Sequence, residues 1–161
     1  MEELRLVNDR NAPDVVEAPG TDAVGPPAPR PCSSCPYRRD VASGVWHADE
    51  YNKLREYDKE MPDQPVALFQ CHQTDADSDL RRLCAGWAGC HRDNLLALRL
   101  ALIQNRISPA VFEAAIGYCS PTPLFGSGTE AADHGQRDID IPGPSAVHTM
   151  AKISRRRPDL L

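Results

Sequence analysis

The sequence predicts a small, mostly α-helical single domain with one short strand or hairpin. Three stretches combine apolar residues at helical spacing with suitable end residues, whereas only one stretch alternates as a strand does. All six cysteines lie between Cys32 and Cys119. Because aromatic residues make up only 6% of the 161 residues, apolar burial is modest, and we expect the cysteines to help hold the fold.

Proline and aromatic residues divide the chain into three parts. Residues 1–31 hold six of the 15 prolines, six acids against three bases, and no aromatic residue, which predicts a disordered acidic arm. All nine aromatic residues lie between Tyr37 and Phe125, so we place the cysteine-rich core at 32–126. Residues 127–161 are expected to form an extended C-terminal segment with a short helix.

Two helices are predicted in the core ahead of residue 106. The helix over 48–60 has two acids in its first turn, where the helix dipole favours negative charge. The helix over 93–105 follows Asp93 and Asn94, either of which can serve as its N-cap. Because this second helix is apolar almost all round, we expect it at the centre of the fold.

The next helix, over 109–116, has the clearest boundaries. Ser108 is a suitable N-cap, Pro109 fits the first turn, and Gly117 ends the apolar pattern. The remaining elements have weaker signals: short helices over 79–84 and 145–156 and one strand over 65–71.

The cysteine spacing predicts a metal site. Cys32 and Cys35 form a C-x-x-C turn, which lets two thiolates reach one metal ion. Cys71 ends the predicted strand, and Cys84 precedes a stretch with two glycines. We therefore predict that Cys32, Cys35, Cys71 and Cys84 bind zinc, because a closed zinc site would stabilise a thin core. An iron–sulfur cluster is the alternative, since four thiolates also hold such clusters.

Three further side chains can replace one of these four ligands, namely Cys90, His91 and His72. Neighbouring residues in extended chain point to opposite faces, so only one of each adjacent Cys-His pair can reach a given metal ion. Cys119 has no partner nearby in sequence and fits a buried free thiol. Disulfides are disfavoured, because the N-terminus lacks the apolar region of a secretory signal.

Four short motifs give the chain a family resemblance over about residues 30–105. They are Cys32-x-x-Cys35-Pro36-Tyr37-Arg38, then Trp46, Phe69-x-Cys71-His72 and Cys84-Ala85-Gly86-Trp87. In this combination the chain resembles an uncharacterised cysteine-rich family of actinobacteria and the phages that infect them. The resemblance implies that the four cysteines belong to one site and that His72 lies near it. It implies no reaction.

The absent motifs, the net charge and the lack of long apolar runs disfavour several classes of function. The chain lacks the phosphate-loop, dinucleotide, zinc-protease and deaminase motifs, so a zinc hydrolase or thiol oxidoreductase is the least favoured alternative. A net charge of -5 disfavours nucleic acid as partner, although 155–157 is a run of three arginines. No apolar run approaches the ~18 residues of a membrane span. We expect a cytoplasmic, non-catalytic metal-binding protein that contacts another protein in an interaction or regulatory role.

Overall fold

The structure is a computed structural model that describes residues 24–74 and 77–161. This part of the chain contains six α-helices and one 3₁₀ turn, and its β-pairing is limited to isolated bridges. The predicted mostly α-helical single domain is therefore confirmed. The elements are α1 (Ala48–Glu56), η1 (Met61–Asp63), α2 (Ala85–His91), α3 (Leu96–Ile103), α4 (Pro109–Ile116), α5 (Gly128–Gln136) and α6 (Pro144–Arg156).

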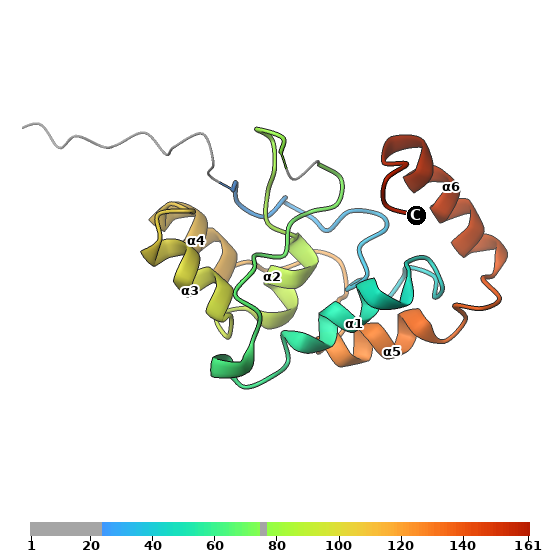
Figure 1. The fold of residues 1–161 in the computed structure, drawn as a ribbon, viewed down its shortest axis with the longest axis horizontal. Helices are drawn as coiled ribbons and strands as arrows, with labels where there is room; N and C mark the ends of the chain where they lie inside the picture. The colour runs from blue at the N-terminus through green and yellow to red at the C-terminus, as the bar shows by residue number, and fades with distance from the viewer. Residues whose placement is uncertain (1–23, 75–76) are drawn as a thin grey trace, which may run out of the picture.

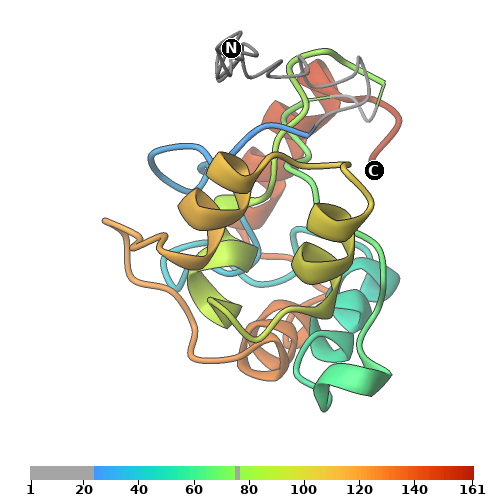
Figure 2. The ribbon, with the colours of Figure 1, turned by 90° about the vertical axis from the view of Figure 1, so that its left-hand side faces the viewer.

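The helices surround a centre that consists largely of loops. Helices α1 and α5 lie side by side, α3 and α4 pair at one end, and α6 lies at the opposite end (Figure 1). Figure 2 looks onto the α3–α4 end and shows α2 behind that pair. Long connections between α1 and α2 and ahead of α1 cross the middle, so the chain segments that carry the cysteines meet there.

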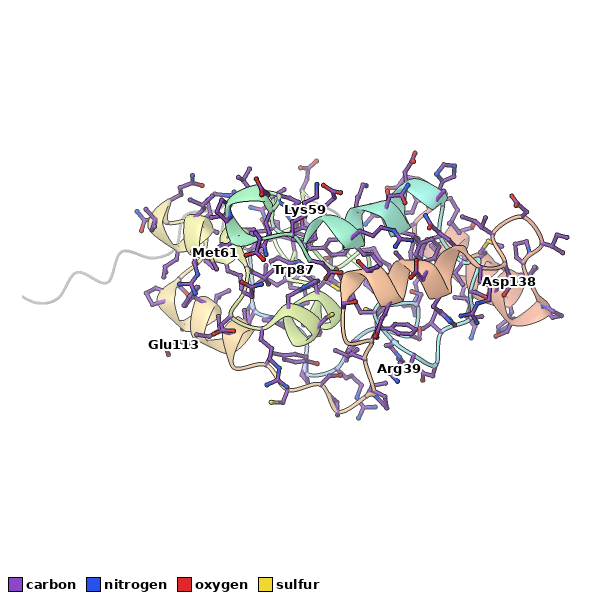
Figure 3. The ribbon with its side chains drawn as sticks, turned by 90° about the horizontal axis from the view of Figure 1, so that it is seen from below. Arg39, Lys59, Met61, Trp87, Glu113 and Asp138 are labelled. Carbon is purple, nitrogen blue, oxygen red and sulfur yellow. The ribbon has the colours of Figure 1, made fainter. Side chains whose placement is uncertain are left out.

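The core centres on Trp87 of α2, whose side chain is 0% exposed. Its ring packs against those of Tyr57 and Phe69, with centroids 5.4 and 6.5 Å away. Tyr37 packs edge-on against Phe69 at 5.9 Å. Figure 3 shows Trp87 inside the molecule, whereas the labelled charged side chains lie around the outside. A few large rings therefore supply much of the apolar burial in a chain that has few of them.

Helix α5 packs on α1 through glycine. A Cβ at Gly128 would lie 2.0 Å from the Leu54 carbonyl oxygen, and one at Gly135 would lie 1.9 Å from the Tyr51 ring. The Asp58 carboxylate completes the contact, because it accepts hydrogen bonds from the backbone N–H of Gly128 at 2.8 Å and of Thr129 at 2.6 Å. The sequence prediction missed α5, since two glycines in nine residues weaken the local helix signal.

Two predicted helices have different bounds in the structure. The helix predicted over 48–60 ends at Glu56. The helix predicted over 93–105 begins only at Leu96, and neither Asp93 nor Asn94 caps it. The Gln64 side chain accepts a hydrogen bond from the Leu96 N–H at 3.0 Å and satisfies this donor from a distant part of the chain.

The expected central position of that helix is also wrong. Helix α3 lies at one end of the molecule, and its Ile103 side chain is 76% exposed. Only Ala97, Leu98 and Ala101 of α3 are buried. Apolar side chains of α3 thus include exposed ones, so apolar content alone did not predict the place of this helix.

The segment before α2 is extended rather than helical. The helix predicted over 79–84 is absent, and the strand predicted over 65–71 is reduced to a single antiparallel bridge between Gln70 and Leu83. The helix begins one residue after Cys84, at Ala85. By contrast, the helix predicted over 109–116 is confirmed, and α6 starts within one residue of its predicted start.

Part of the predicted arm lies within the described residues. The Val24 side chain is 4% exposed, and Gly25 pairs through both backbone groups, with Arg81 O at 3.0 Å and Leu83 N–H at 3.0 Å. The stretch 24–31 is thus held against the core, where the sequence predicted a disordered arm. Residues 1–23 of that arm lie outside the described residues. In the described part of the chain, no helix has both the length and the apolar character to cross a membrane.

The α1–α5 contact generates a stability prediction. In a helix interior Ala is favoured over Gly by about 1 kcal/mol, yet we expect Gly135→Ala to destabilise the protein by about 1–3 kcal/mol, because the added methyl group overlaps the Tyr51 ring. Urea unfolding measures the difference. Gly143→Ala is the control, since nothing lies within 4 Å of a Cβ there, and a loss in the control as large as that in Gly135→Ala would contradict the packing argument.

Candidate metal centre

The C-x-x-C turn is held by backbone hydrogen bonds on both sides. The Cys35 N–H donates to the Cys32 carbonyl at 3.1 Å, and the Arg38 N–H donates to the Cys35 carbonyl at 3.1 Å. Trp46 fixes the turn from outside, since its indole N–H donates to the Ser34 carbonyl at 3.0 Å. These hydrogen bonds within the protein orient the thiols of Cys32 and Cys35.

The Gln70–Leu83 bridge brings the second pair of cysteines together. The Cys71 N–H donates to the Arg82 carbonyl at 2.9 Å, and the Cys84 N–H donates to the Phe69 carbonyl at 2.9 Å. Cys71 and Cys84 therefore flank the bridge, one on each side. A short pairing between two extended segments thus brings Cys71 and Cys84 together, which their spacing in the sequence does not show.

The four predicted ligands are in contact through their sulfurs. The Cys35 and Cys84 sulfurs are 3.9 Å apart. The Cys32 sulfur contacts the thiols of Cys35 and Cys71. The contacts run in the order Cys71, Cys32, Cys35 and Cys84, and all four are free cysteines. Three separate chain segments thus supply one cluster of thiols.

Within the cluster, the Cys32 sulfur is the favoured site for a negative charge. Hydrogen bonds from Cys35 and Cys71, with a further one from His72, hold the pKa of the Cys32 thiol well below its usual range, although burial opposes this. The bond to Cys32 raises the pKa of Cys35, and burial adds to the rise. Because thiolates are the form that binds metals, Cys32 is the sulfur best prepared to bind one.

His72 lies beside the cluster. Its Nε2 atom is 2.7 Å from Ser34 Oγ and 3.4 Å from Cys32 Sγ. Its ring packs against Trp46, with centroids 4.5 Å apart. His72 can therefore act as a fifth donor or as a hydrogen-bond partner of the Cys32 sulfur.

Gly86 allows α2 to approach the cysteine turn. A Cβ at this position would lie 2.3 Å from Cys35 Sγ and 2.9 Å from Tyr37 Cβ. No other residue fits without moving the turn. This glycine therefore makes room for a sulfur from a distant part of the chain.

The side chains of Cys90 and His91 have surroundings different from those of the four predicted ligands. Helix α2 is continuous over Ala85–His91, and six residues span about 240° of a helix, so Cys84 and Cys90 face different directions. The His91 Nε2 atom is 3.3 Å from the Tyr37 hydroxyl, and its Nδ1 atom is 3.7 Å from Asp58 Oδ1. Burial raises the pKa of Cys90 to about 12. The structure brings neither residue into contact with the four sulfurs.

The sulfurs also border a cavity of about 300 Å³. Cys32, Cys71 and Cys84 line it together with the cationic side chains of Arg30 and Arg82. Among the described residues, no three His, Cys, Asp or Glu side chains converge closely enough on one point to hold an ion as they stand. The four thiols form a chain of contacts, and a shared ion would draw their sulfurs toward a common centre.

The fold and this cluster define a small helical, cysteine-rich domain. Residues 27–157 match the profile of a family of unknown function, DUF6283. The chain belongs to that family, which confirms the expectation of an uncharacterised domain family. Comparisons with curated proteins and with solved structures found no match.

His91 makes stability depend on pH. Burial lowers its pKa to about 4, against an opposing effect of Asp58, whereas the unfolded value is 6.5. The folded state therefore has its full stability above pH 6.5 and loses it as the pH falls toward 4, because the unfolded state binds the proton more readily. We expect this residue to account for a loss of about 2 kcal/mol between pH 7.5 and pH 5.

The measurement compares chemical unfolding at the two pH values in the wild type and in His91→Gln. We expect the variant to show a smaller loss on acidification. His148→Gln serves as control, since His148 is exposed on α6, and it should lose as much stability as the wild type. A pH dependence that is the same in His91→Gln as in the wild type would contradict the assignment.

Proposed function

We propose that this chain is a small, non-catalytic cytoplasmic protein in which Cys32, Cys35, Cys71 and Cys84 hold a structural zinc ion. It acts by contact with another protein, in an interaction or regulatory role, and is encoded by an actinobacterium or one of its phages. The observation that carries the metal proposal is the gathering of four thiols from three chain segments into one chain of contacts.

Thiols are donors that zinc prefers, and one pair of them has the spacing of a zinc site. Zinc–sulfur bonds of about 2.3 Å in a tetrahedral site place two sulfurs about 3.8 Å apart, close to the 3.9 Å between Cys35 and Cys84. The Cys71 sulfur also accepts a hydrogen bond from the Gln73 backbone N–H. Backbone donors of this kind offset negative charge on a metal-bound thiolate.

The surroundings offset the charge that such a site would carry. Four thiolates around a divalent ion leave two negative charges, and Arg30 and Arg82 line the adjoining cavity. Arg38 also donates from its guanidinium to the Cys32 carbonyl at 3.2 Å, but its charge is paired with the Asp40 carboxylate at 2.5 Å, so it holds the turn rather than adding a free cation. When bound, zinc would supply a crosslink and no redox chemistry.

A crosslink at this place would join the start of the core to its middle. Cys32 and Cys84 are separated by 51 intervening residues, and closing a loop of that size in the unfolded chain is entropically costly. The site would therefore stabilise the packing around Trp87, whose aromatic neighbours come from the same segments.

The second candidate is an iron–sulfur protein with a redox or sensing role. The observation in its favour is the 300 Å³ cavity that three of the four cysteines border, since a cluster needs more room than one ion. Metal analysis with an absorption spectrum of the anaerobically purified chain separates the two candidates. We expect a colourless protein with one zinc per chain, whereas brown protein with stoichiometric iron and sulfide supports the second candidate.

Chelation tests whether any metal stabilises the fold. We expect a strong chelator to lower the melting temperature sharply and added zinc to restore it, because the bound ion contributes to folding only in the native state. An unchanged melting curve, in protein that contains neither zinc nor iron, would overturn the metal proposal for both candidates.

Substitutions of single cysteines supply the matched test. We expect Cys32→Ala and Cys84→Ala to lose the metal and most of the cooperative unfolding transition. Cys119 is exposed rather than buried as the sequence suggested, so Cys119→Ala should keep the metal and change the free energy of unfolding by less than about 0.5 kcal/mol. Metal content and circular dichroism report both properties, and equal effects in all three variants would contradict the assignment.

A further inference from the structure

A second cavity lies between the cysteine turn and α6. Its volume is about 500 Å³, in the range of sites for small molecules. Three of its lining side chains are cations from the last two turns of α6, namely Lys152, Arg155 and Arg156, and none of the described lining residues is an acid. In a chain with a net charge of -5, a cavity with three cations and no carboxylate departs strongly from the overall balance.

Within the described part of the chain, no ion pair joins the cations of this cavity to an acid. Arg156 donates to the Gln73 side-chain oxygen at 3.0 Å, a neutral partner that orients it across the cavity. Among the described residues, no carboxylate lies within ion-pair distance of Lys152 or Arg155. The nearby Asp159 carboxylate pairs with Arg157 at 2.7 Å. The cavity therefore keeps its positive charge.

Favourable interaction with the helix dipole explains only part of this arrangement. Cations in the last turn of a helix are stabilising by themselves, which accounts for Arg155 and Arg156. The helix dipole does not account for the concave shape of the cavity. Nor does it account for the position of Ser33 and Ser34, which line the same cavity as the cations. Ser33 is exposed on the cysteine turn and lines the cavity, so its hydroxyl can donate a hydrogen bond there.

We propose that this cavity binds the phosphate group of a small phosphorylated molecule such as a nucleotide. Arginine guanidinium groups match the oxygens of a phosphate in pairs, and lysine adds a compact charge. The concave, half-open shape favours a small ligand over a nucleic acid backbone, which needs an extended basic surface. The proposal does not depend on the metal, although the ligand would contact the turn that carries Cys32 and Cys35.

The test is an amide NMR titration of the full chain, as purified, with inorganic phosphate and separately with adenosine monophosphate. Sodium chloride at matched ionic strength is the reference. We expect saturable shifts confined to residues 33–34, Gln73 and the second half of α6 with both ligands. Saturation with phosphate alone means that the phosphate group suffices, and tighter binding of the nucleotide means that the cavity also contacts the nucleoside; either result supports the proposal.

A pair of double variants supplies the control. Lys152→Gln with Arg155→Gln should weaken binding at least about tenfold, because each lost charged hydrogen bond weakens binding strongly. Arg106→Gln with Arg137→Gln removes the same charge at exposed sites outside the cavity and should change the affinity less than about twofold. Equal weakening in both variants, or shifts with a single-stranded oligonucleotide but with neither small ligand, would overturn the proposal.

Discussion

The close contact between the first turn of α2 and the cysteine turn is the constraint on which the rest of the structure depends. A Cβ at Gly86 would lie 2.3 Å from the Cys35 sulfur, so the two segments meet with no side chain between them. This contact positions Cys84 beside Cys35 and, one residue beyond the glycine, inserts Trp87 into the ring cluster. One glycine thus links the thiol cluster to the apolar core.

The polar contacts of the core also depend on the position of α2 against the cysteine turn. With α2 fixed, His91 reaches Tyr37 and Asp58, and Asp58 in turn holds the first N–H groups of α5. A buried neutral histidine, a carboxylate and a helix start therefore form one connected set that joins α2 to α5. Because the chain has few aromatic residues, such specific polar contacts supplement the apolar burial that joins these helices.

The cysteine turn has two faces with different chemistry. On one side its sulfurs meet Cys71 and Cys84, and His72 lies against Ser34. On the other side Ser33 and Ser34 border the basic cavity of α6. The C-terminal segment closes over this region, since Arg157 donates to the His72 carbonyl at 3.3 Å and Arg156 to the Gln73 side chain. A ligand in the cavity and a metal on the sulfurs would therefore share the cysteine turn and the segment from Cys71 to Gln73.

The sequence by itself determined the helical class, the bounds of α4 and nearly those of α6, because caps, prolines and apolar spacing act within a few residues. It also singled out four cysteines that the structure brings into contact. Only the tertiary structure decided that Cys90 and His91 face elsewhere, that α5 packs on α1 through glycines, and that Gln64 caps α3. These features depend on contacts between residues far apart in sequence, and local spacing carries no information about which distant backbone a glycine or a side-chain amide will meet.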